Sequence, residues 1–358
     1  MQVQTRISMK FSNSYIFYPD NKALDKAVEH FHSMLSNDTQ VEGCVEGKTR
    51  APGNSSDILR KNTLGQFQPQ TYGLQFLETV QEAFENALTE EYRQQTPLDW
   101  AATQVHLGIV LATIGQSRSD SGLLEKSIQA FNNVLEERNQ ENTPQHWAST
   151  QFNLATVLQV LGRQQSDSKL LKQSVDAYTS ALTEWTREKT PQQWALTMFN
   201  LGITFHIHGT LLKGNRTFQK SVVAYKNALA ELNADRDPLE LTITHNNRGA
   251  VLQSLGESEE NPERLEEAIR SYETALTVCQ EQQLPIHLAV MIRANLATSR
   301  NELAELKRDS AVAEQVADDL ELILELFNNA CHPECLEHCR EQLQRAQKMA
   351  ETFAVNGK

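Results

Sequence analysis

The residues best suited to chemistry lie near the end of the chain, in segment 331–339, which reads CHPECLEHC. Its possible metal ligands are Cys331, His332, Cys335, His338 and Cys339. Thiolates and imidazoles are ligands that zinc prefers, and Cys335 and Cys339 stand one helical turn apart. Three ligands on one helix without a second Cys-x-x-Cys pair are nevertheless poor zinc spacing. The same stretch carries an apolar stripe, and free cysteine is often buried, so we favour a packed core and expect no cofactor.

No catalytic motif stands out elsewhere in the sequence. The chain has no Gly-x-x-x-x-Gly-Lys, no His-Glu-x-x-His and no Gly-x-Ser-x-Gly. We therefore expect that the protein is not an enzyme.

Charge and hydropathy exclude two classes of partner. The formal net charge is -13, and nucleic-acid binding draws most of its affinity from clustered Lys and Arg, so we expect no nucleic-acid partner. No run approaches eighteen apolar residues, and the N-terminus has no apolar segment of the signal-peptide type. We expect no membrane partner and a cytoplasmic location.

The rest of the chain is organised by a repeat of 47 residues. The motif Thr-Pro-x-x-Trp-Ala occupies 96–101, 143–148 and 190–195, and weaker copies begin at 237 and 284. Thr or Asp before Pro predicts a helix start, with the side-chain oxygen as the N-cap and Pro at the first helical position. Two copies add Gln193 or Glu240 at the capping-box spacing. A fixed period of this size is typical of a repeat architecture.

Further positions recur at the same interval. We expect glycines to end the first helices as left-handed caps: Gly115, Gly162, Gly209 and Gly256. Aromatic residues recur in the second helices: Phe131, Tyr178, Tyr225 and Tyr272. We expect these rings and the repeated Trp100, Trp147 and Trp194 to pack in the core between helices.

The repeat divides the chain into three predicted regions. Residues 1–72 would form an N-terminal cap with a partial repeat and a flexible loop. Residues 73–310 would form the repeat array, with repeats starting near 97, 144, 191, 238 and 285. Residues 311–358 would form capping helices that carry the Cys/His segment. The fifth repeat slips by one residue, since Asn295 stands one step later than Asn200 would require.

One repeat resembles the tetratricopeptide repeat (TPR), a helix-turn-helix unit. The resemblance lies in Leu154, Ala155, Leu158, Ser174, Tyr178 and Ala181. The 47-residue form is similar to long repeats of bacterial TPR proteins, some of which are fused to signalling or protease-like domains. The resemblance implies an all-α, right-handed solenoid of antiparallel helix pairs that acts as an interaction scaffold.

The resemblance also implies that the first helices line a concave groove that binds a protein or peptide. An asparagine ladder, Asn153, Asn200 and Asn247, would hold the backbone of an extended segment, because a carboxamide both donates and accepts hydrogen bonds. Apolar and aromatic contacts would come from Val105, Ile109, Phe152, Phe199, Ile203 and His206. The alternatives are hydrogen bonds between repeats for the asparagines and internal packing for the others.

We therefore expect a non-enzymatic scaffold or adaptor that binds a partner's peptide or helix. Three alternatives stay open. The chain would be a sensor or regulatory subunit for a separate protease-like or nuclease-like effector, a solenoid that self-assembles through its ends, or a protein with a zinc or redox site in the C-terminal segment.

Overall fold

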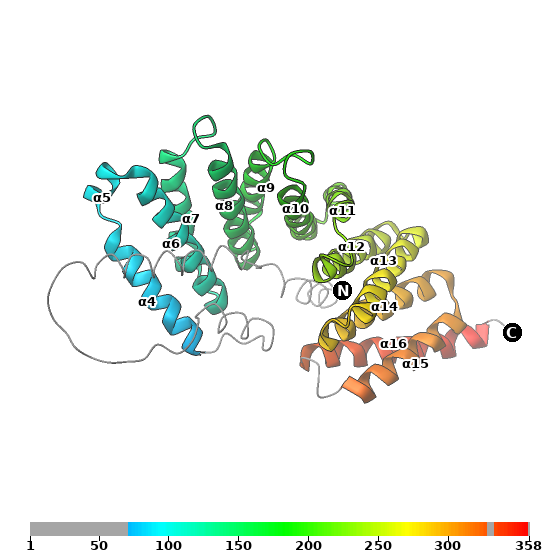
Figure 1. Cartoon of the computed structure of the whole chain (residues 1–358). Coiled ribbons are helices and arrows are strands. Elements are labelled where there is room, and N and C mark those ends of the chain that lie inside the picture. Colours follow the sequence, from blue (N-terminus) through cyan, green and yellow to red (C-terminus); the bar gives the residue numbers. More distant parts are fainter. Residues whose placement is uncertain (1–70, 328–332, 357–358) are drawn as a thin grey trace. The chain divides into compact units, whose positions relative to one another are not determined.

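The computed structural model describes residues 71–327 and 333–356. These residues form α-helices joined by short turns, and they include no strand (Figure 1). The helices in chain order are α4 Thr71–Ala87, α5 Glu90–Gln95, α6 Pro97–Arg118, α7 Ser121–Glu137, α8 Pro144–Gln164, α9 Ser168–Ala181, α10 Pro191–Leu212, α11 Asn215–Leu229, α12 Pro238–Glu259, α13 Pro262–Glu281, α14 Ile286–Lys307, α15 Ser310–Phe327 and α16 Pro333–Asn356. The all-α fold is confirmed, and the predicted N-terminal region, residues 1–72, lies almost wholly outside the described residues.

Helices α6 to α13 form four consecutive pairs with the predicted period. Each first helix begins at a proline of the ladder: Pro97, Pro144, Pro191 and Pro238. Each second helix packs against the first helix of its own pair. The fifth first helix, α14, begins one residue later, at Ile286, with Pro285 as its N-cap residue. The proline ladder therefore predicts the helix starts closely.

The predicted capping chemistry is wrong in detail. Thr96, Thr143 and Thr190 occupy N-cap positions, yet none makes a side-chain bond to the helix it precedes. Their hydroxyls instead donate to the carbonyl oxygen four residues earlier, at 3.2 to 3.4 Å. The hydroxyl is engaged by the preceding turn, and proline needs no N–H partner at the first helical position. The helix starts therefore depend on proline rather than on a capping box.

The glycines predicted as helix caps have another role. The left-handed residues are not glycines, and they stand four positions further on: Ser119, Ser166, Lys213 and Glu260. A Cβ atom at Gly209 would lie 2.7 Å from the Phe218 ring, and one at Gly256 would lie 2.7 Å from Leu265. Glycine is needed because the second helix approaches the first helix closely at this point.

A second close approach between paired helices lies nearer the start of the first helix. A Cβ atom at Gly202 would lie 2.6 Å from the ring of Tyr225, which is fully buried. One residue pair also links the helices by a hydrogen bond, since Ser221 Oγ donates to the Gly202 carbonyl at 2.6 Å. Ser127 and Ser174 make the equivalent bonds to Gly108 and Ala155. The predicted interlocking of large and small residues is confirmed.

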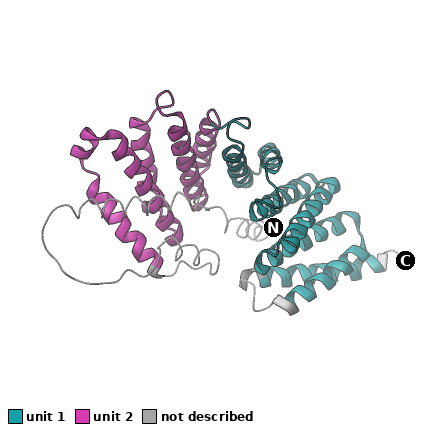
Figure 2. Cartoon of the chain, in the orientation of Figure 1, with its two compact units in different colours: residues 1–17, 185–358 teal, residues 18–184 magenta. Residues whose placement is uncertain are grey.

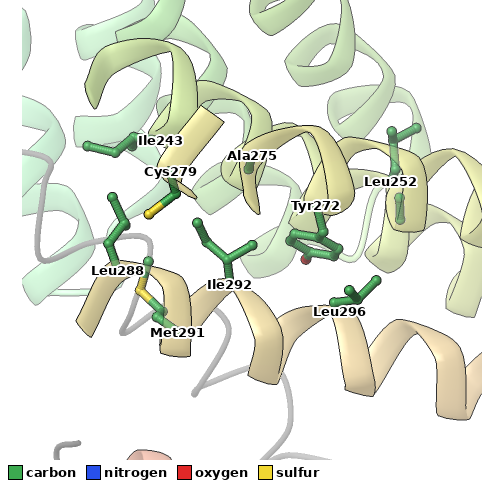
Figure 3. Packing of buried hydrophobic residues seen from close by; sticks show 10 residues of the cluster. Ile243, Leu252, Tyr272, Ala275, Cys279, Leu288, Met291, Ile292 and Leu296 are labelled. Atoms are coloured by element: carbon green, nitrogen blue, oxygen red, sulfur yellow. The ribbon is translucent and has the colours of Figure 1, made fainter. Parts of the chain in front are cut away.

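The chain divides into two compact units, coloured in Figure 2. Unit 2 contains α4 to α9 among its described residues, and unit 1 contains α10 to α16. In unit 1, Tyr272 and Ala275 of α13 face Ile292 and Leu296 of α14 in one apolar cluster (Figure 3). A second cluster joins α14, α15 and α16 and includes Cys339. Each unit therefore has a core of its own.

Candidate functional site

In unit 2 the candidate groove residues lie on two first helices that contact each other, α6 and α8. Val105 and Phe152 hold the same position in their repeats, and both are half-buried. Val105 packs beside Trp100 and Ala101. The Phe152 ring meets the edge of Tyr178, with centroids 5.4 Å apart. Partly covered apolar side chains of this kind leave surface that a partner can bury.

Asn153 is the most available polar residue of the predicted ladder. Its side chain is half-buried on α8, next to Phe152, and it forms no hydrogen bond with any residue in 71–327 or 333–356. A free carboxamide presents two N–H donors and an accepting oxygen. That set matches the amide groups of an extended peptide. Ile109, the remaining candidate of unit 2, is buried.

In unit 1 most of the candidate residues lie in the interior. Asn200 is 4% exposed, and its Nδ2 donates to the Leu196 carbonyl at 2.9 Å. Asn247 is 1% exposed and accepts from Asn246 at 3.4 Å. Ile203 and His206 are also buried. These four side chains would reach a partner only if their helices separated, so their burial favours the packing alternative.

Two candidates of unit 1, His206 and Phe199, each contact another aromatic ring. The buried His206 ring meets the Phe218 ring at 5.8 Å, and burial lowers the pKa of His206 to about 4. Phe199 is half-buried against the apolar cluster of Figure 3, with its ring 6.1 Å from Tyr225. Phe199 is therefore the only member of the predicted set among the described residues of unit 1 that keeps partial exposure.

Asn295, the asparagine of the fifth repeat that stands one residue out of register, shows what a ladder asparagine does in unit 1. Asn295 of α14 is buried, and its Nδ2 donates to Asn246 Oδ1 at 2.9 Å. This is a hydrogen bond between repeats, which is the alternative that the sequence left open. The partner of Asn295 is Asn246, the residue before the ladder position Asn247.

Two residues of the Cys/His segment, His338 and Cys339, lie in a protein core. Cys331 and His332 fall outside the described residues, as does the side chain of Cys335. Cys339 is 1% exposed within the cluster of α14, α15 and α16. His338 is equally enclosed, with Nε2 2.9 Å from Thr298 Oγ1, and burial lowers its pKa to about 4. Among the described residues no group of three His, Cys, Asp or Glu side chains is placed to hold a metal ion.

Sequence reasoning missed a polar interior between α12, α14 and α16. Gln253 accepts from Ser299 at 2.9 Å and from the Tyr272 hydroxyl at 3.3 Å. Asn301 donates to Gln342 Oε1 at 3.0 Å. Tyr272 belongs to the periodic aromatic series, but Ser299 and Asn301 follow Leu252 and Ser254 at the 47-residue period, so the sequence carries no periodic signal for their polar contacts.

A second missed feature does have a periodic signal. The Arg93 guanidinium lies 4.6 Å from the centroid of Trp100 and pairs with Glu137 at 2.6 Å. Two repeats later, Arg187 lies 5.5 Å from Trp194 and pairs with Glu231 at 2.6 Å. Two of the three repeated tryptophans, Trp100 and Trp194, thus take part in a cation–π contact. Trp100 is buried as predicted, whereas Trp147 and Trp194 are only partly buried.

Comparisons with known proteins leave the family open. No family model matches the chain, and no curated protein matches it. Among solved structures, the chain is similar to a "circular tandem repeat protein with novel repeat topology and enhanced subunit contact surfaces", at 16% identity and a TM-score of 0.31. That match covers 98% of this chain and 83% of the other. Both values are too low for the similarity to indicate function. No described helix is long and apolar enough to cross a bilayer.

Proposed function

We propose that this chain is a non-enzymatic protein-interaction module of the tetratricopeptide kind. Paired helices at a strict 47-residue period support it, because such arrays expose one face of each repeat at regular spacing. The glycine, aromatic and small-residue positions that resemble the family are the positions where the two helices of a pair touch. An extended protein segment is the proposed ligand.

The observation that carries the proposal is the state of Asn153 and Phe152 on α8. Asn153 is partly exposed and unpaired among the described residues, whereas the ladder residues of unit 1 are enclosed. Phe152 beside it offers an aromatic surface of the type that dominates binding at interfaces. We propose that Asn153 bonds the backbone of the bound segment while Phe152 and Val105 cover its side chains.

Site-specific photo-crosslinking tests this proposal. A photoreactive phenylalanine replaces Phe152 in the native cell, and the matched control places it at Lys172, an exposed position on α9. We expect a specific protein adduct from position 152 that is missing from position 172. The purified partner should then bind the Asn153→Ala chain about tenfold more weakly, the equivalent of about 1.4 kcal/mol. Identical adducts from both positions, or unchanged affinity, would refute the proposal.

A further inference from the structure

The second helix of the third repeat, α11, carries only positive charges. We call α11 and the equivalent α13 the outer helices. The protein carries 46 Asp and Glu, yet residues 189–230 contain none of them. The four cations on and just before α11 are exposed: Lys213, Arg216, Lys220 and Lys226. None of the four forms an ion pair with a residue in the described ranges of the chain. Lys220 Nζ lies 5.6 Å from the centroid of the Phe205 ring, so its contact within the chain is with an aromatic face and not with a negative charge. The four positive charges can therefore pair with a partner of opposite charge.

One repeat later, every one of these positions holds a glutamate. The residues 47 positions after the four cations are Glu260, Glu263, Glu267 and Glu273. Three of them are exposed, and Glu267 is partly exposed. Helices α11 and α13 thus carry opposite charges at these four equivalent repeat positions, and α13 also carries Arg264 and Arg270.

The two sets of charges occupy the equivalent faces of their helices. Both helices bury the same positions, as Tyr225 and Tyr272 or Ala228 and Ala275 show. Both pack on α12, which lies between them in the chain. Because the inward faces correspond, the outward faces also correspond. Unit 1 therefore carries a basic strip on α11 and a strip of four glutamates at the equivalent positions of α13, and α12 lies between these two helices in the chain.

The acidic strip keeps free charge although some of its residues are paired. Glu267 contacts Arg264 at 3.3 Å, and Glu273 contacts Arg300 at 3.1 Å. Glu260 and Glu263 have no such contact among the described residues. The two strips are thus complementary in charge, and neither neutralises the other within the chain.

We propose that unit 1 binds a second copy of this chain through the outer faces of α11 and α13. A two-fold arrangement would place α11 of one copy on α13 of the other, and the reverse. Each cation would then meet the glutamate at its own repeat position, and one isologous contact would satisfy both strips. Val223, 56% exposed at the middle of α11, would lie against the aliphatic portion of Arg270 of the second copy.

This surface differs from the ends of the array, and it differs from the Phe152 site, which belongs to unit 2. A contact led by exposed charges is weakened by salt, because the Debye length falls from about 14 Å at 50 mM to about 6 Å at 300 mM. We expect a dimer whose dissociation constant rises about tenfold or more over that range. The Phe152 crosslinking result does not depend on it.

Reciprocal charge reversal tests the proposal on the full chain. One variant carries Arg216→Glu with Lys220→Glu, and the other carries Glu263→Lys with Glu267→Lys. Analytical ultracentrifugation should show each variant alone as a monomer, because like charges then face each other. An equimolar mixture of the two should form a heterodimer, because both contacts become complementary again. A chain with all four changes should regain the wild-type dimer.

Circular dichroism and melting temperatures establish that the variants fold. Lys220→Gln and Glu267→Gln replace the reversals if folding suffers, and each should weaken the dimer several-fold. A wild-type chain that stays monomeric at about 100 μM in 50 mM salt would overturn the proposal. So would a mixture or a four-change chain that stays monomeric. If wild type instead binds a poly-glutamate peptide through α11 without dimerising, the cations serve an acidic protein segment and the self-association is wrong.

Discussion

Units 2 and 1 use one repeat position in different ways. On α8 of unit 2, Asn153 is half-buried and unpaired among the described residues. On α12 of unit 1, the equivalent Asn247 is enclosed, and its neighbour Asn246 bonds Asn295 of the next repeat. The same residue type at the same period is available for recognition in one unit and closed off in the other. A periodic asparagine therefore indicates a binding role only where no neighbouring helix covers it.

The two units also differ in which helices their buried polar pairs connect. Unit 1 encloses hydrogen-bonded polar pairs between distant helices, such as Thr298 with His338 and Asn301 with Gln342. In unit 2, a buried polar pair such as Thr156 with Tyr178 joins the two helices of one repeat, at 2.9 Å. A buried polar group is costly when it loses its partner. Unit 1 should therefore be the more sensitive unit to loss of one partner and to pH.

The largest effect should come from filling a glycine contact. Gly202→Val in unit 1 forces a side chain into the Tyr225 ring and should lower the free energy of unfolding by about 3 kcal/mol. The matched position in unit 2 already carries Ala155, so Ala155→Gly should cost only about 1 kcal/mol. Urea unfolding measures both. Equal small losses would contradict the close-approach argument.

Acid should weaken unit 1 through His206 and His338. Burial lowers both pKa values to about 4, below the ordinary value near 6.5, so the unfolded chain binds more protons between these values. The contribution of each histidine is full above pH 6.5 and is lost as the pH drops toward 4, by about 2 to 3 kcal/mol. Glu257 of α12 acts in the opposite direction, because burial raises its pKa to about 7. His338→Leu should flatten this region of the profile in urea titrations at pH 7 and pH 4.5. A variant with the wild-type slope would exclude His338.

Loss of one partner in the polar interior should have an intermediate effect. Thr298→Val keeps the shape of the side chain but leaves His338 Nε2 without its 2.9 Å contact, and should cost about 2 kcal/mol. The control is Thr150→Val in unit 2, whose buried hydroxyl donates only to a carbonyl of its own helix and should cost about 0.5 kcal/mol or less. The double change Thr298→Val with His338→Leu should recover stability. Failure of the double change to do so would show that the pair is not the cause.

The smallest effect should come from the serine bond between paired helices. Ser221→Ala removes the 2.6 Å bond to the Gly202 carbonyl and should cost about 1 kcal/mol, with Ser174→Ala in unit 2 alike. Exposed Thr179→Ala is the control and should change stability by less than about 0.5 kcal/mol. Thermal melts compare the three. A clear difference between the two serines would show that the bond is not equivalent in both units.

Sequence patterns predicted what depends on local chemistry. Pro97 and its successors mark helix starts because proline suits the first helical turn. The fourfold Gly115 series was misread because glycine serves both left-handed caps and close helix contacts, and only the neighbouring helix distinguishes them. The exposure of Asn153 and Asn247 was out of reach for a similar reason. Asn247 is covered within unit 1, where the adjacent Asn246 bonds Asn295 of the fifth repeat, and no local pattern around Asn247 indicates this contact.

The polar interior of unit 1 could not be predicted from the sequence either. Thr298, Asn301 and Gln342 have no periodic counterparts, and ordinary helix patterns place such residues on the surface. Instead, α16, which follows the regular repeats, packs on α14 and pairs its own His338 and Gln342 with Thr298 and Asn301.

The most direct test of the account measures binding and stability together for Asn153→Ala and Asn247→Ala, with the partner recovered by crosslinking at position 152. The account predicts that Asn153→Ala weakens binding about tenfold and leaves the melting temperature unchanged. It predicts that Asn247→Ala lowers the melting temperature and leaves the affinity of the folded chain unchanged. The reverse pattern, with affinity lost at Asn247 and stability lost at Asn153, would contradict the assignment of the recognition site to unit 2.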